Sequence, residues 1–302
     1  MANKLRTLEE ILNLTSKEID RIIDDKPRYY LSYPIRKKSG KPRFIDAPQG
    51  KLKLIQKTIL KEIFYRFSPY SIAHGFVHGR SPISNAKHHV NTNVLVNLDV
   101  MNFFNSITQD RVVMCLDYIF GKQKDVVKET DNLLYQLSEL LTYKGRVPQG
   151  ASTSPTFSNL VCLGMDKDLK ALEPLFGCVV TRYADDITAS SGHNEHLPRI
   201  IPKINGIVRK HGFRLNYGKT RVRRQNNRMV VTGIVVNKRL NISKKDYRQL
   251  RAKFHNMIKN NVTINNKEYE ILKGKIEWIR SLHPNRGCIF QEKLSKLILK
   301  NS

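Results

Sequence analysis

The chain has few cysteines and no long apolar run, and each shortage excludes a class of protein. No apolar run approaches the ~20 residues that a membrane-spanning helix needs, so we expect no membrane span and no membrane partner. The four cysteines are spread out and fit no CxxC spacing, which excludes the common zinc modules. Their apolar neighbours predict buried free thiols in a reducing cytoplasm.

Acidic residues are also scarce, and their distribution is uneven. The 302 residues include 53 Lys/Arg against 26 Asp/Glu, for a net charge of +27. Residues 201–302 hold 25 Lys/Arg against 5 Asp/Glu, whereas residues 1–200 hold 28 against 21. The C-terminal third is therefore a polycation, and its natural partner is a polyanion, nucleic acid before membrane.

Helical and strand-like patterns follow one another in an order that indicates an α+β fold with an antiparallel sheet. Two capping boxes, Thr7 with Glu10 and Thr15 with Glu18, predict two short helices at the start. We expect an N-terminal helical extension over residues 1–27, a main body over 28–240 and a basic helical segment over 241–302. Further predictions are one helix over 154–172, a strand over 230–236 whose interior glycine marks a bulge or a close backbone approach, and helices over 246–259 and 267–282.

The stretch Tyr183-Ala184-Asp185-Asp186 carries two adjacent carboxylates between strand-like runs. Side chains alternate faces along a strand, so neighbouring acids serve one site only at a tight turn. Carboxylate oxygens suit Mg²⁺, and a hairpin tip with two acids is an arrangement for holding it. A solvated surface turn is the alternative, because Asp is a favoured turn residue.

Asp99 is the candidate for a third carboxylate. It ends the apolar run 94–99, where an unpaired buried charge would be costly, although a helix cap or a salt-bridged strand end is the alternative. Phe103 and Phe104 follow it, and two aromatics at this spacing fit either plain core or the floor of a nucleotide pocket.

Four segments in a fixed order make a resemblance specific. Residues 98–107 resemble the first carboxylate motif of reverse transcriptases, and Tyr-Ala-Asp-Asp resembles their second. Between them, residues 148–155 match the Gln-Gly-x-x-x-Ser-Pro motif of that family. Residues 212–220 are similar to the motif that supplies a late lysine, here Lys219. We therefore expect an RNA-directed DNA polymerase.

The resemblance implies a right-hand polymerase fold, with fingers and palm over residues 28–240 and a small helical thumb over 241–302. It implies Asp99, Asp185, Asp186 and Lys219 as catalytic residues. The three aspartates and the carbonyl of Val100 would hold two Mg²⁺ ions, and Lys219 would protonate the leaving pyrophosphate. An ordinary surface lysine is the alternative for Lys219.

The resemblance also assigns the binding of the incoming dNTP. Arg43 resembles the finger arginine that clamps the triphosphate, and Phe104 stands where the family has a steric gate against the 2′-hydroxyl. Solvated surface charge and core packing are the respective alternatives. The expected nucleotide-binding residues are Lys41, Arg43, Phe103, Phe104, Gln149, Gly150 and Tyr183.

Two further motifs resemble those of bacterial retron reverse transcriptases. Residues 85–89 match the family's Asn-Ala-x-x-His signature, and residues 231–233 match its Val-Thr-Gly signature. His89 is alternatively an ordinary half-buried histidine. We expect RNA contacts from both motifs and from the cations of one basic helix. These residues are Asn85, Ala86, His89, Val231, Thr232, Gly233, Lys244, Lys245, Arg248, Arg251 and Lys253.

A retron enzyme implies particular partners. The template would be a cognate structured noncoding RNA (msr-msd), and the primer the 2′-hydroxyl of an internal guanosine. The product would be branched multicopy single-stranded DNA (msDNA), with the template trimmed by host RNase H. A separate effector protein would act with it in anti-phage defence. Two alternatives remain: a scaffold that holds RNA–DNA and an effector in an inhibited complex, and a stand-alone reverse transcriptase of the abortive-infection type.

The side chain of Trp278 is expected either in the core or on the surface as a platform for stacking.

Overall fold

The structure is a computed structural model that describes residues 5–36, 40, 42–193 and 196–297. Lys41 lies outside the described residues. The strands are β1 (Tyr30–Arg36), β2 (Pro42–Pro48), β3 (Val94–Asp99), β4 (Val179–Tyr183), β5 (Asp186–Ser191), β6 (Arg221–Arg224), β7 (Val230–Val231) and β8 (Ile234–Val235). The helices of the body are α1 (Leu8–Leu12), α2 (Ser16–Asp24), α3 (Gly50–Glu62), α4 (Pro82–Lys87), α5 (Gln109–Lys122), α6 (Leu133–Leu141), α7 (Ser154–Val161), α8 (Leu163–Lys170), α9 (Leu172–Phe176) and α10 (Ile200–Lys210). The C-terminal helices are α11 (Lys244–Lys259), α12 (Asn266–Leu282) and α13 (Pro284–Ser295).

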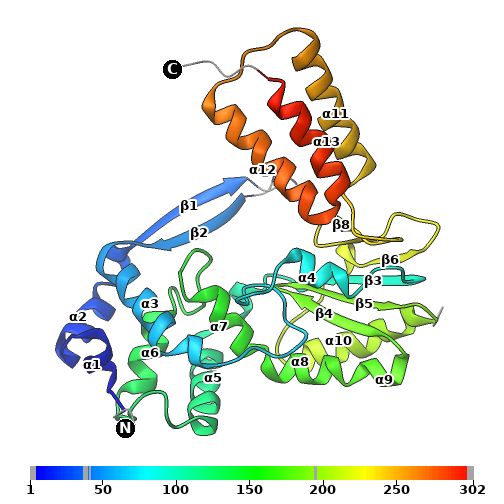
Figure 1. Cartoon of the computed structure of the whole chain (residues 1–302). Coiled ribbons are helices and arrows are strands. Elements are labelled where there is room, and N and C mark those ends of the chain that lie inside the picture. Colours follow the sequence, from blue (N-terminus) through cyan, green and yellow to red (C-terminus); the bar gives the residue numbers. More distant parts are fainter. Residues whose placement is uncertain (1–4, 37–39, 41, 194–195, 298–302) are drawn as a thin grey trace.

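A four-stranded sheet in the order β4-β5-β3-β6 forms the palm. Its neighbouring strands all pair antiparallel, which confirms the predicted α+β fold with an antiparallel sheet. The apolar residues of β3 are buried, and α8, α9 and α10 lie along one side of this sheet (Figure 1). The β1–β2 hairpin forms a separate two-stranded sheet that projects from the body as the fingers (Figure 1).

Three apolar clusters stabilise the chain. The largest joins the palm sheet to α3, α5, α6 and α10, and it includes Leu8 and Ile19 of the N-terminal helices. Both capping boxes of those helices form as predicted. The helices α11, α12 and α13 make a bundle with its own core, which stands apart from the body in Figure 1. A third, small cluster lies between them, and it includes Leu95 of β3 and Leu282 of α12.

Several local expectations were wrong. Residues 154–172 form not one helix but α7, α8 and the start of α9, because the segment passes from α5 of the body to α10 and β4 of the palm. Residues 230–236 are a tight hairpin, in which Thr232 (φ +47°) and Gly233 (φ +84°) form the turn, rather than a bulged strand. Three cysteines are buried free thiols, but Cys288 is exposed.

Within the described residues, none of the helices combines the length and apolar character needed to cross a bilayer.

Candidate active site

The two adjacent acids lie at the tip of the β4–β5 hairpin. Tyr183 pairs with Asp186, so Ala184 and Asp185 form a two-residue turn. Ala184 is buried and has φ +56°, a left-handed conformation that a side chain other than glycine adopts only when its surroundings enforce it. The expected tight turn is therefore present.

Asp99 faces this tip across the sheet. It is the last residue of β3, and its register partner is Asp186. The N–H of Val100 donates a hydrogen bond to the carbonyl of Asp185 at 2.8 Å. The sheet thus brings Asp99 next to Asp185 and Asp186, which follow it in the sequence by 86 and 87 residues.

Lys219 is brought to the three aspartates by the segment that follows α10. The segment that follows α10 pairs with the end of β3, since the N–H of Asn216 donates to the carbonyl of Asp99 at 2.8 Å and that of Met101 to Arg214. Lys219 Nζ then donates to Asp99 Oδ1 at 2.6 Å. The Lys219 side chain is 62% exposed and that of Asp99 only 12%, so the lysine covers the carboxylate from the solvent side.

The acids perturb one another. Burial raises the pKa of Asp186 to about 6, and the charges of Asp185 and Asp99 add to this effect. Burial also raises the pKa of Asp185, helped by Asp99 and opposed by Lys219 and Arg43. The hydrogen bond to Asp99 raises the pKa of Lys219, which keeps it protonated. The three aspartates give the site an excess of negative charge, which the ammonium of Lys219 balances only in part.

This chemistry fits divalent cations. Carboxylate oxygens are the ligands of Mg²⁺, and Lys219 already stands as a cation against Asp99. Among the side chains that the structure describes, no three acids, histidines or cysteines form a ready-made metal cage. The acids therefore supply the right donors, and Lys219 balances the charge of Asp99 alone.

Three residues that the sequence analysis missed hold the turn in place. The Arg182 guanidinium is fully buried and binds both carboxylate oxygens of Asp166 at 2.6 Å. Its Nη1 donates to the carbonyl of Ala184 at 3.0 Å. On the other side Gly75 lies so close that an added Cβ would come within 2.5 Å of the Ala184 nitrogen. These contacts explain how Ala184 keeps its left-handed backbone.

The segments expected to bind the nucleotide pack on one another. The N–H of Asp46 in β2 donates to the carbonyl of Gln149 at 2.8 Å. Gly150 has φ +126°, and a Cβ there would meet Ile45 at 2.8 Å. Arg43 is an exposed residue of the same strand, and its charge is among those that lower the pKa of Asp185.

The two phenylalanines separate. Phe103 is 3% exposed and stacks on Phe213 at 5.5 Å, so its ring belongs to the core and does not line a nucleotide pocket, contrary to the expectation. Phe104 is half-buried, and the centre of its ring lies 5.3 Å from that of Phe103 and 6.2 Å from that of Phe76. Of the two rings, that of Phe104 is the more exposed.

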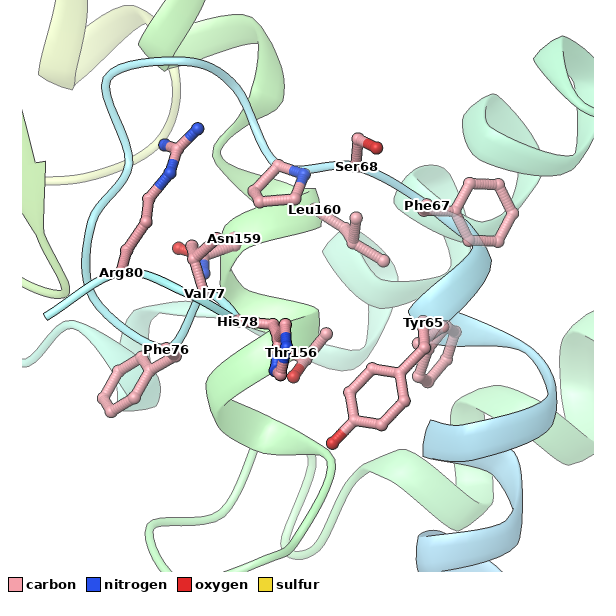
Figure 2. Close-up of a pocket in the computed structure, with 12 residues that line it drawn as sticks. Tyr65, Phe67, Ser68, Phe76, Val77, His78, Arg80, Thr156, Asn159 and Leu160 are labelled. Atoms are coloured by element: carbon pink, nitrogen blue, oxygen red, sulfur yellow. The ribbon is translucent and has the colours of Figure 1, made fainter.

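A cavity of about 660 Å³ lies between α7 and the loop that carries Phe76 (Figure 2). Figure 2 shows Phe76, His78 and Thr156 around it, with Asn159 on its wall. Asn159 donates to the carbonyl of Gly75 at 2.9 Å and accepts from Arg182 at 3.1 Å. Asn159 therefore lines the cavity and also supports the two residues, Gly75 and Arg182, that hold the carboxylate turn.

The two retron-like motifs are mostly buried, which corrects the expectation that they contact RNA. Asn85, Ala86, His89 and Val231 are each at most 1% exposed. The His89 ring bonds Ser190 and Thr181 hydroxyls, both at 2.7 Å, and burial lowers its pKa to about 3.

The Val-Thr-Gly hairpin packs on the helix of the first motif. Thr232 Oγ1 donates to the carbonyl of Pro82 at 3.1 Å, and Ala86 and Val231 belong to the same apolar cluster. Gly233 alone of the two motifs' predicted residues is classed as exposed, at the turn. The buried residues of the two motifs therefore pack α4 against the β7–β8 hairpin.

The predicted thumb cations are exposed on α11, but they do not share one face. Helical spacing places Lys244, Arg248 and Arg251 on one side. Lys253 lies on the opposite side and pairs with Glu268 of α12 at 2.8 Å. Lys245 lies between the two faces.

Comparison with known proteins gives this geometry a context. The family model described as "Reverse transcriptase (RNA-dependent DNA polymerase)" matches residues 35–236. The retron Mx162 reverse transcriptase of Myxococcus xanthus is 34% identical over 90% of this chain, and the retron Mx65 enzyme of the same organism is 31% identical over 87%. The retron Ec86 reverse transcriptase of Escherichia coli is 26% identical over 99%.

The lengths differ between these relatives. The chain spans 62% and 64% of the two Myxococcus proteins, and 92% of the Escherichia coli protein. Among solved structures, telomerase from Candida albicans superposes with a TM-score of 0.52 at 13% identity, over 83% of this chain and 52% of that one. At that identity the likeness shows a shared polymerase fold.

Proposed function

Since the chain belongs to the reverse transcriptase family, we propose that it is an RNA-directed DNA polymerase of the retron type. The observation that carries the proposal is the meeting of Asp99, Asp185, Asp186 and Lys219 at one end of the palm sheet. The names of the relatives and the two retron-like motifs favour the retron type within the family.

Asp99, Asp185 and Asp186, with the carbonyl of Val100, would hold two Mg²⁺ ions, which would activate the primer hydroxyl and neutralise the triphosphate. The remaining tasks fall to the protein's own side chains. Lys219 is protonated beside the acids and would give its proton to the leaving pyrophosphate. Arg43 would hold the triphosphate from the finger strand, and the ring of Phe104 would exclude a 2′-hydroxyl.

The proposed template is a structured noncoding RNA encoded beside the gene, and the proposed primer is the 2′-hydroxyl of one of its guanosines. The product is then a branched RNA–DNA molecule. The basic thumb supports RNA binding, because neutralising phosphates supplies most of the affinity for nucleic acid. Host RNase H and an effector protein acting in anti-phage defence complete the proposal.

The test uses the full chain with its upstream transcript, dNTPs and Mg²⁺. We expect labelled DNA that remains attached to RNA on a denaturing gel and shortens when RNase is added. The double variant Asp185→Asn, Asp186→Asn should give none. The matched control, Asp117→Asn with Asp131→Asn, removes two exposed acids outside the site and should leave synthesis intact.

The alternatives give different results. Unattached DNA made without this transcript would indicate a stand-alone enzyme of the abortive-infection type. A double variant that loses synthesis yet still restores defence in cells would indicate a scaffold. Branched product from the double variant would reject the assignment of the acids.

A further inference from the structure

A groove on the thumb has no part in the polymerase chemistry. It lies between α11 and α12 and has a volume of about 390 Å³, within the range of sites that bind small ligands. Its lining comes from one face of each helix and from the preceding loop. The lining residues are Ile242, Asp246, Gln249, Leu250, Lys253, Lys275, Trp278 and Ile279.

Trp278 is the notable member of this lining. It is the only tryptophan of the chain, and it is 41% exposed in a helix whose neighbouring Ile279 is buried. Leu250 and Ile279 are buried and close the groove from below. An indole on the rim of an apolar floor offers a flat surface against which a planar ligand can stack.

Charge separates the groove into two parts. Lys275 supplies a cation, Lys253 is already paired with Glu268 at 2.8 Å, and Asp246 supplies an acceptor that is held by the hydroxyl of Ser243 at 2.6 Å. A carboxylate repels phosphate but accepts hydrogen bonds from the N–H groups that each common nucleobase carries. A nucleotide therefore fits with its base against Trp278 and its phosphate toward Lys275.

We propose that this groove binds one unpaired nucleotide of the RNA, with its base stacked on Trp278. The inference rests on the proposed function for the identity of the polyanion. The groove lies on the side of α11 opposite to Lys244, Arg248 and Arg251, so its own lysine, Lys275, supplies the cation for the phosphate of that nucleotide. Such stacking is how proteins hold single-stranded RNA without reading its sequence.

The single tryptophan allows a direct test on the unmodified chain. Titrating it with an adenylate RNA octamer should quench its fluorescence, because the base would stack on the indole. An abasic octamer with the same phosphates should quench little. Trp278→Ala should weaken binding of the adenylate octamer about tenfold, within the range measured for loss of one stacked base. Trp278→Phe, which keeps a ring, should retain most of the affinity.

The matched control is Tyr135→Ala, which removes an aromatic of 55% exposure from α6 in the body. It should leave octamer binding unchanged. Equal quenching by both octamers, no quenching by either, or equal affinities for Trp278→Ala and Tyr135→Ala would overturn the proposal and leave the groove to another partner. Extension of a DNA primer on an RNA template by the same preparations reports on the proposed function separately.

Discussion

The buried pair of Asp166 and Arg182 gives the sharpest prediction for the catalytic turn. Both side chains are 0% exposed. Burial alone would lower the pKa of Arg182, but the charge of Asp166 raises it above its usual value, so the guanidinium stays charged. Asp166→Asn keeps the shape of the side chain and leaves this charge without a counter-ion. Breaking one partner of a buried pair costs about 3–5 kcal/mol, and we expect a loss near the lower figure because the amide oxygen still accepts one bond.

Equilibrium unfolding in urea measures this loss. The matched control is Asp168→Asn, two residues along the same helix, whose carboxylate pairs with Lys210 at 2.8 Å. The Asp168 side chain is 29% exposed and also bonds His211 Nε2 at 2.9 Å; since Lys210 is 69% and His211 23% exposed, solvent screens both contacts, and their loss should cost no more than about 1 kcal/mol. Equal losses for the two variants would refute the reasoning.

A second variant separates stability from position. Replacing both partners, Asp166→Leu with Arg182→Met, removes the buried charges together and should recover much of the stability lost in Asp166→Asn. It also removes the hydrogen bond from Arg182 to the carbonyl of Ala184. We therefore expect a lower kcat in primer extension from a stably folded protein. Full activity of the double variant would show that the turn does not depend on Arg182.

Three further predictions concern selectivity, RNA affinity and acid stability. Phe104→Ala should raise ribonucleotide use relative to dNTP use about tenfold or more in single-nucleotide extension, and an unchanged ratio would return Phe104 to core packing. Neutralising Lys244, Arg248 and Arg251 with Gln should weaken RNA binding and reduce the slope of log K against log salt by about 2, at roughly 0.7 per single-strand phosphate contact; an unchanged slope would reject this face as the clamp. Burial lowers the pKa of His89 to about 3, so the stability it contributes is present above about pH 6.5 and is lost as the pH falls toward 3. His89→Gln should therefore flatten the fall of unfolding free energy over that range by up to about 1.4 kcal/mol per pH unit, and a parallel curve would show that His89 does not titrate there.

The parts of the site that depend on local pattern could be predicted from the sequence. Two adjacent acids between strand-like runs require a tight turn, and the structure has one at Ala184 and Asp185. Asp99 ends an apolar strand, and its pairing with Asp186 follows once β3 and β5 lie side by side. The two long thumb helices follow from apolar spacing, and their ends differ from the predicted ones by no more than a turn.

The parts that depend on which faces become covered could not be predicted. Arg182 looks like the polar end of a strand, and only the packing of α8 on β4 shows that Asp166 meets it. Gly233 fits a bulge as well as a turn until β7 and β8 pair. His89 can be assigned to RNA or to the core from sequence alone, and only the hydroxyls of Thr181 and Ser190 around it decide for the core.

The burial of the two retron-like motifs changes what they can do. His89 follows α4 and joins it to β4 and β5, the hairpin whose tip carries Asp185. Ala86 of α4 packs in the same small cluster as Val231 and Leu282, the last residue of α12 in the thumb. One short helix therefore supports both the catalytic hairpin and the joint from which the thumb projects. Substitutions of the buried residues Ala86, His89 and Val231 would then alter RNA use by moving the thumb relative to the acids.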